Sequence, residues 1–433
     1  MKNNIGGAVT LNQKLFLARA LLCISALLFC AYGNETAFGQ QAAGTEAAIP
    51  EQYRPLYRTL QESLREISQA YPLQQNLPRP VVCPNLCPAA SVWNPWESEQ
   101  QWQDVLATLE AFKRLGASGV LLQIVAPDLA DGNTERVIEF YQRLAAEVRA
   151  RGMTVYVEHF VNTPFKANGS RARGGKPATS RELKDDPEGR AEFLKVLEQE
   201  VTLIYKEIKP DYLSILTEPE LAIHQQLHLT FSAAALGNWA SEVAARLKKT
   251  GSSPNTLLGA GGLIFEPEEF FLTVAKSRSV DYLDMHLYVI KMRGEDQLAK
   301  LSALIRKVRE TRPDMQCTIG EAWLFKQGKD GPKATVQEIF ARDNFSFWSP
   351  LDTDFLKLLI GVAQKERIAV IVPYFSQYLF SYYTFGDSES ASLPLWPASV
   401  KVSWTRALGM VHKGELSPTG KALKEVLNAG SRQ

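Results

Sequence analysis

Two glutamates of this chain stand where apolar segments end. Glu218 follows the segment 211–217, and Glu321 ends the segment 316–321. Two carboxyl groups held roughly 5–5.5 Å apart suit hydrolysis of a glycosidic bond with retention of configuration. One of them attacks as an ionised nucleophile, and the other holds a proton because the neighbouring negative charge raises its pKa. The pair predicts glycosidase chemistry if the fold brings both segments together; each glutamate alone could instead cap a helix or pair with an arginine.

Polar and aromatic residues also stand where other apolar segments stop. We expect six of them to contact the substrate: His159, Thr217, His286, Tyr288, Trp323 and Tyr374. His and Tyr also fill protein cores as hydrogen-bonded residues, and aromatic side chains near strand ends can pack instead of stacking on sugar. Strand side chains alternate. We therefore expect Glu158, which precedes His159, to point toward the wall of the sheet or toward a helix.

The elements that must position these residues alternate along the chain. The apolar runs, each read as a strand, are 79–83, 119–125, 153–160, 211–217, 256–264, 281–288, 316–321 and 368–375. Helical patterns occupy 51–75, 97–115, 134–151, 188–208, 231–249, 266–278, 294–311, 351–366 and 417–428. Several runs are apolar at consecutive positions, which is typical of a parallel sheet covered by helices. Eight strand–helix units predict an α/β protein with a single-domain (β/α)8 TIM barrel, long loops at its C-terminal face and the active site at the carboxyl ends of the strands.

At these strand ends the sequence resembles the glycoside hydrolases of clan A. The residues that carry the resemblance are Thr-Glu-Pro at 217–219, Ile-Gly-Glu-Ala-Trp at 319–323, and the His286-x-Tyr288 pattern. The resemblance implies that Glu218, after strand 4, is the acid/base and that Glu321, after strand 7, is the nucleophile. It also implies a hydrogen bond from Tyr288 to the nucleophile and no metal or organic cofactor.

The chain departs from the clan pattern at three places. Thr217 stands where the clan has an asparagine before the acid/base, and Gln123 stands where it has an arginine after strand 2. Strand 8 offers Tyr374 and Phe375 in place of a tryptophan. These differences bear on which family of the clan the chain resembles and on which substrate it takes, more than on the type of reaction.

Two other functions compete with the glycosidase. One is a barrel that binds carbohydrate or a cell-envelope partner without cleaving it. The other is a metal-dependent hydrolase, because His224 and His228 lie one helical turn apart. Gln225 occupies the position of the glutamate in an HExxH motif, so that motif is absent.

The first 39 residues have the order of a secretory signal. Lys2, Lys14 and Arg19 precede an apolar run at 20–31, which small residues follow. Twelve residues are short of the roughly 20 that span a bilayer. We therefore expect a signal peptide at 1–39 and a secreted or periplasmic protein without a transmembrane span once processed; an uncleaved anchor is the alternative.

Composition and cysteine content complete these expectations. The chain has 433 residues with 48 basic and 47 acidic side chains, and this balance gives no electrostatic case for nucleic acid as a partner. The expected partner is an oligo- or polysaccharide, with the oligomeric state open. Residues 40–78 are expected to form a linker and a helix, and 79–428 the barrel. Cys83 and Cys87 could form a disulfide, whereas Cys317 is expected to pack.

Overall fold

The structure is a computed structural model. It describes residues 49–74, 76–86, 98–125, 134–161, 185–288, 290–292, 295–327, 336–391, 393 and 398–429. The predicted signal peptide at 1–39 lies outside these residues, as does Cys87. Cys83 and Cys317 are both buried free thiols.

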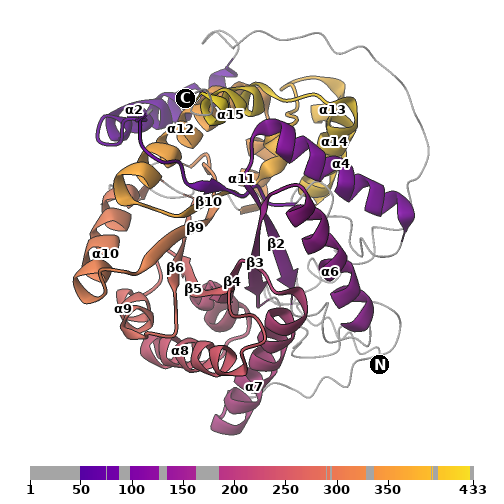
Figure 1. Ribbon diagram of the computed structural model, residues 1–433. Helices are drawn as coiled ribbons and strands as arrows, with labels where there is room; N and C mark the ends of the chain where they lie inside the picture. The colour runs from indigo at the N-terminus through magenta and orange to yellow at the C-terminus, as the bar shows by residue number, and fades with distance from the viewer. Residues whose placement is uncertain are drawn as a thin grey trace, which may run out of the picture.

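Eight strands form one sheet at the centre of the molecule (Figure 1). They are β1 (Val81–Val82), β2 (Gly119–Val125), β3 (Thr154–Phe160), β4 (Tyr212–Thr217), β5 (Leu257–Leu263), β6 (Tyr282–Leu287), β9 (Gln316–Ala322) and β10 (Val370–Pro373). Their order is β1-β10-β9-β6-β5-β4-β3-β2, and every ladder is parallel. A separate antiparallel pair, β7 (Lys291–Met292) and β8 (Glu295–Asp296), follows β6.

The sheet closes on itself between β1 and β2. The backbone N–H of Ser118 donates to the carbonyl of Val82 at 3.1 Å, and the N–H of Leu121 donates to the carbonyl of Pro84 at 3.1 Å. These bonds join the two ends of the strand order. The sheet is therefore a barrel, and its strands all point their carboxyl ends to one face.

Helices surround the barrel (Figure 1). They are α4 (Glu99–Leu115), α6 (Thr134–Ala150), α7 (Pro187–Leu203), α8 (Ala233–Thr250), α9 (Glu268–Lys276), α10 (Gln297–Thr311), α11 (Val336–Asp343), α12 (Ser349–Glu366), α13 (Ser388–Ala391), α14 (Ala398–Lys413) and α15 (Pro418–Asn428). The predicted (β/α)8 fold is confirmed, with each of the eight strands inside or within one residue of its predicted range. No helix among the described residues is long and apolar enough to cross a membrane.

Local signals set the helix ends. Ser98 begins α4 with its hydroxyl accepting the N–H of Gln101 at 3.2 Å, and Gly116 ends the helix at φ +96°. A side-chain oxygen at the first position satisfies an N–H that the helix leaves unpaired, and glycine adopts the left-handed conformation without a Cβ clash. Asp186 caps α7 in the same way by accepting the N–H of Gly189 at 2.8 Å.

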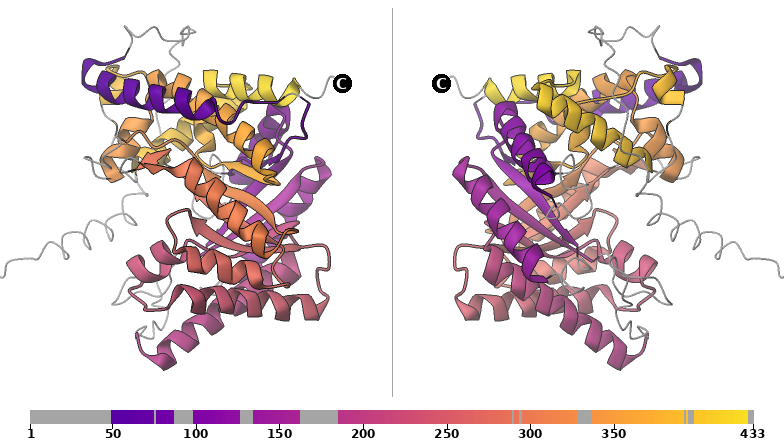
Figure 2. Two further views of the ribbon diagram at one scale, coloured as in Figure 1. Left: turned by 90° about the vertical axis from the view of Figure 1, so that its left-hand side faces the viewer. Right: turned by 90° about the vertical axis from the view of Figure 1, so that its right-hand side faces the viewer.

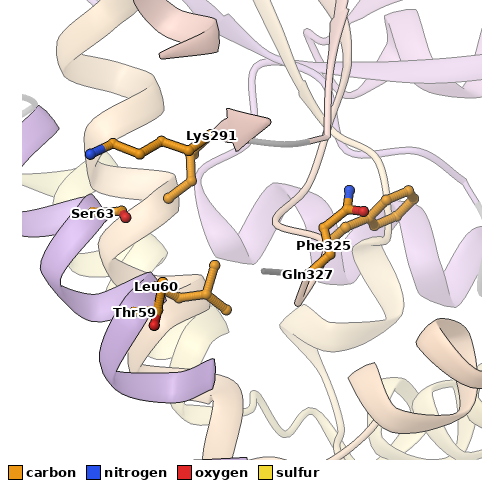
Figure 3. A pocket seen from close by; sticks show the side chains of 7 residues that line it. Thr59, Leu60, Ser63, Lys291, Phe325 and Gln327 are labelled. Atoms are coloured by element: carbon orange, nitrogen blue, oxygen red, sulfur yellow. The ribbon is translucent and has the colours of Figure 1, made fainter. Parts of the chain in front are cut away.

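An N-terminal helix precedes the barrel and lies beside α12 (Figure 2). This helix, α2 (Arg54–Ser68), carries Tyr57, whose ring stacks on Trp348 with centroids 5.8 Å apart. Its other face borders a small pocket that Thr59, Leu60 and Ser63 line together with Phe325 (Figure 3). The helix is therefore packed onto the barrel wall next to the loop that follows β9.

Tyrosines fill the lower barrel interior. Tyr156 and Tyr282 are fully buried, with ring centroids 6.0 Å apart, and Tyr212 stacks on Tyr156 at 5.6 Å. Gly259 makes room for Tyr282, since a Cβ there would lie 2.2 Å from the ring. This packed layer leaves the upper interior as the place for polar side chains.

A buried ion pair fixes the loop after β9. Lys326 Nζ lies 2.5 Å from Asp352 Oδ1, and both side chains are fully buried. Lys326 also donates to the carbonyl of Leu324 at 2.9 Å, while the Tyr382 hydroxyl donates to Asp352 at 2.9 Å. Burial raises the pKa of Asp352 to about 6, against the opposing charge of Lys326. The pair ties the segment just beyond Glu321 to α12.

Lys326→Met is expected to destabilise the fold by about 3–5 kcal/mol, because it leaves the Asp352 carboxylate buried without its counter-charge. The free energy of unfolding in urea measures this. Lys307→Met is the matched control, since Lys307 pairs with Glu268 at the surface and such pairs contribute about 1 kcal/mol or less. Equal losses in the two variants would contradict the prediction.

Candidate active site

Glu218 directly follows β4 in a constrained backbone conformation. Its φ is +49°, a left-handed value that costs free energy for a residue with a side chain. Its N–H donates to the carbonyl of Gly261 at 3.1 Å. Gly262 accommodates the turn, because a Cβ there would lie 2.9 Å from Glu218 Cα. Neighbouring β5 thus holds Glu218 in a conformation that aims its carboxyl group into the barrel.

Glu321 lies within β9 and accepts two hydrogen bonds from neutral donors. Gln123 Nε2 donates to its Oε1 at 2.7 Å, and the Tyr288 hydroxyl donates to its Oε2. Tyr374 orients the amide by donating to Gln123 Oε1 at 2.9 Å. Hydrogen bonds that are all donated to a carboxyl group favour its ionised form. These two donors therefore oppose the effect of burial on Glu321 and hold its carboxyl group in one orientation.

His286 joins the two glutamates. Its Nδ1 donates to Glu218 Oε1 at 2.7 Å and lies 3.5 Å from Glu321 Oε2. These two distances limit the separation of the two oxygens to about 6 Å at most, an upper bound compatible with the roughly 5–5.5 Å between the carboxyl groups of a retaining glycosidase. Glu218 is 4% exposed and Glu321 is 3% exposed.

The pKa values of Glu321 and His286 are both raised, and in each group the effect of burial and the effect of the partner's charge oppose each other. Burial raises the pKa of Glu321 well above its usual value, and the charge of His286 opposes this rise. Burial alone would lower the pKa of His286, but the Glu321 charge, the nearby Asp284 and Glu158 carboxyl groups and the hydrogen bond to Glu218 outweigh it and raise the pKa well above its usual value. The site therefore places several buried acids around one buried histidine.

A further carboxyl group lies beside Glu218. Glu266, just after β5, accepts the N–H of Glu220 at 3.2 Å on both oxygens. Burial raises its pKa to about 8, with the charges of Glu218 and Glu220 adding to the effect and the hydrogen bond from Glu220 opposing it. Glu266 thereby holds the turn that presents Glu218.

The structure reverses the expected orientations of Glu158 and His159. His159 is fully buried on the outer side of β3, where its Nε2 lies 3.0 Å from Glu200 Oε2 of α7. Glu158 instead faces inward and accepts a hydrogen bond from Gln123 at 3.1 Å. The reason is the parity of β3, because Glu158 shares the inward face with Tyr156. The placement of His159 against α7 does not fit the expected contact with substrate.

Three other residues that were expected to contact the substrate, Thr217, Trp323 and Tyr374, make contacts within the protein. The Thr217 hydroxyl donates to the carbonyl of His159 at 2.6 Å and is fully buried. Trp323 is 1% exposed and packs against Tyr378 with ring centroids 5.5 Å apart. Only Tyr374 is partly exposed, at the inner edge of the site. Thr217 and Trp323 therefore serve as rim packing, while Tyr374 orients Gln123.

Three residues of the site were not predicted from the sequence. Gln123 was not expected to donate a hydrogen bond to Glu321, and neither Asp284 nor Glu266 was expected at the site. Asp284 stands two positions before His286 on the same strand, so the alternation of β6 could have identified it. Gln123 pairs in register with Glu158 across β2 and β3. Glu266 follows its strand in a turn, and no sequence signal pointed to it.

The predicted alternative metal site does not form among the described residues. His224 pairs with Glu220 at 2.7 Å, and neither His224 nor His228 joins a group of three convergent ligands there. Atoms of Glu158, His286 and Glu321 do lie within 4.8 Å of one another. Gln123 donates to both of these glutamates, and Tyr288 donates to Glu321.

The chain matches no protein-family model and no curated protein. Among solved structures it is similar to an exo-β-1,4-mannosidase from Opitutaceae bacterium strain TAV5, with 14% identity and a TM-score of 0.49 over 81% of this chain and 59% of that one. It is similar to a glycoside hydrolase family 5 mannosidase from Rhizomucor miehei, with 12% identity and a TM-score of 0.47 over 82% and 94% of the two chains. A xylanase from Cellvibrio japonicus shows 11% identity and a TM-score of 0.42 over 80% and 99%. These likenesses concern the fold, and the chain spans 59% of the first structure's length.

Proposed function

We propose that the protein is a glycoside hydrolase that cleaves a bond in an oligo- or polysaccharide with retention of configuration. The observation that carries the proposal is the pair of glutamates, one on each side of His286 Nδ1 at 2.7 and 3.5 Å. Of these two glutamates, Glu218 directly follows β4 and Glu321 lies near the end of β9, where Gln123 and Tyr288 donate to it. Residues 1–39 add export to the proposal, with a secreted or periplasmic location.

The mechanism follows from the surroundings of each carboxyl group. Glu321 attacks the anomeric carbon while Glu218 protonates the departing oxygen, which gives a glycosyl-enzyme intermediate and a free alcohol. Glu218 then removes a proton from water, which attacks the same carbon and releases Glu321. Gln123 and Tyr288 hold Glu321 in the orientation for attack throughout.

The test is a screen of aryl glycosides and of plant, fungal and bacterial polysaccharides. We expect cleavage of at least one, and proton NMR during the first turnovers should show a product with the configuration of the substrate. An inverted first product would contradict the assignment of Glu321 as nucleophile.

A second candidate function is favoured by one observation. Glu218 and Glu321 are almost fully buried and hydrogen-bonded within the protein, as they would be in a barrel that binds carbohydrate without cleaving it. Calorimetric binding of a polysaccharide without any release of reducing ends would support this candidate over the enzyme.

The pH dependence of the proposed reaction tests the state of Glu321. Activity requires its ionised form, so kcat/KM falls as the pH drops below its pKa, and burial places this acidic limb above the ordinary value of 4.5. Tyr288→Phe removes a donor that stabilises the ionised form, and the limb is expected to move to still higher pH. Tyr382→Phe, far from the site on Asp352, is the control that should leave it in place. A limb that stays fixed or moves down in Tyr288→Phe would rule out this role of the hydroxyl.

A further inference from the structure

Beneath the two glutamates, three buried polar atoms converge. Glu158 Oε1 and Asp284 Oδ2 each lie 3.6 Å from His286 Nε2. All three side chains are fully buried, and none of these atoms has a hydrogen-bond partner within the described part of the chain. Atoms of this kind are costly to bury unless charge attraction compensates for the lost water.

Each of the two acids is held so that one oxygen faces His286. Gln123 Nε2 donates to Glu158 Oε2 at 3.1 Å, which leaves Oε1 directed at the ring. Thr318 Oγ1 donates to Asp284 Oδ1 at 3.0 Å, which leaves Oδ2 directed at the ring. Gly320 provides the space, since a Cβ there would lie 2.2 Å from Asp284 Oδ1.

The two sides of the imidazole ring then set its protonation. Nδ1 donates to Glu218, so Nε2 carries either a proton or a lone pair. A lone pair on Nε2 would face the two carboxylate oxygens across 3.6 Å in a fully buried setting, which is repulsive. A proton on Nε2 turns both contacts into attractions and gives the ring a positive charge.

We propose that Glu158 and Asp284 are positioning residues that hold His286 doubly protonated beneath the catalytic pair. The inference rests on the proposed function, because it assigns Glu158, Asp284 and His286 a task in presenting Glu218 and Glu321. His286 keeps both protons during the reaction, and the proton that is transferred belongs to Glu218.

Acidic groups from every strand around the ring support this state. Glu158 comes from β3, Asp284 from β6 and Glu321 from β9. Glu218 follows β4, and Glu266 follows β5 at a greater distance. The imidazolium is the cation that balances this group, and its charge counteracts the effect of burial on Glu321.

The direct test is nitrogen NMR of protein labelled with [15N]histidine, with His286 assigned by the loss of its signals in His286→Gln. At pH 7 both ring nitrogens of wild-type His286 are expected to show the shifts of protonated nitrogens. A neutral ring, or a ring bound to Zn²⁺ when the metal is added alone, would overturn the proposal. This readout needs no activity, so it remains decisive if the proposed function fails.

Asp284→Asn and Glu158→Gln extend the test. Each is expected to make His286 titrate at lower pH, because each removes a negative charge that favours the protonated ring. Glu200→Gln is the matched control, because it neutralises a buried partner of another histidine, His159, on the outer face of β3. The proposal is overturned if either folded variant keeps the wild-type protonation of His286, or if Glu200→Gln causes the same shift. Wild-type NMR decides the question if a variant does not fold.

Discussion

Glu321→Ala is expected to lower kcat on an activated aryl glycoside by on the order of 10⁴-fold or more, because it removes the atom that forms the covalent intermediate. The side chain is held by Gln123 and Tyr288, and no other described carboxyl group accepts hydrogen bonds from both.

Azide should restore part of the lost rate in this variant. Truncation to alanine leaves space beside the anomeric carbon, and a small anion can attack from the side that Glu321 occupied. One displacement in place of two gives a glycosyl azide of inverted configuration, which NMR identifies. Glu200→Gln, at a buried glutamate outside the barrel, should keep the wild-type rate. Near-normal turnover in Glu321→Ala would refute the mechanism.

Glu218→Ala is expected to produce a loss that depends on the leaving group. General acid catalysis contributes about 10²–10⁴-fold to the rate. Cleavage of a substrate with a natural alcohol leaving group should lose this whole contribution. A dinitrophenyl glycoside needs no protonation, so its first step should be nearly unaffected while hydrolysis of the intermediate becomes slow. A burst of dinitrophenol followed by a slow steady state is the expected trace.

Azide separates the two variants by stereochemistry. In Glu218→Ala, azide attacks the glycosyl-enzyme that Glu321 has formed, and the product retains the configuration of the substrate. A uniform loss for good and poor leaving groups would show that Glu218 is not the acid. An inverted azide product in this variant would instead indicate that Glu218 is the nucleophile and Glu321 the acid/base.

Much of the site could be predicted because parallel strands place their carboxyl ends together. Glu218 and Glu321 are far apart in sequence, yet each ends a strand of a closed barrel, so the topology brings them to one face. The His286-x-Tyr288 spacing on β6 directs both side chains the same way, and His286 contacts both glutamates as a result.

The errors at Glu158, His159 and Thr217 have one physical cause. A strand end contains residues of both parities, and the pattern of apolar residues does not say which face is the barrel interior when both are buried. On β3 the inward face carries Tyr156 and Glu158, whereas His159 follows Val157 on the face toward α7. A buried glutamate on α7, Glu200, satisfies His159 there.

The sequence by itself determined the succession of strands and helices and the two glutamates at strand ends, because these depend on periodicity and on residue type. Only the tertiary structure decided that Glu158 and Asp284 lie beside His286 and that Gln123 donates to both Glu158 and Glu321. These contacts join β2, β3 and β6, and they depend on register and strand parity around the barrel. They also depend on Gly320, whose missing side chain leaves room for a carboxylate on the neighbouring strand. The two glutamates were therefore visible in the order of residues, while the group of side chains around His286 depends on the closure of the barrel.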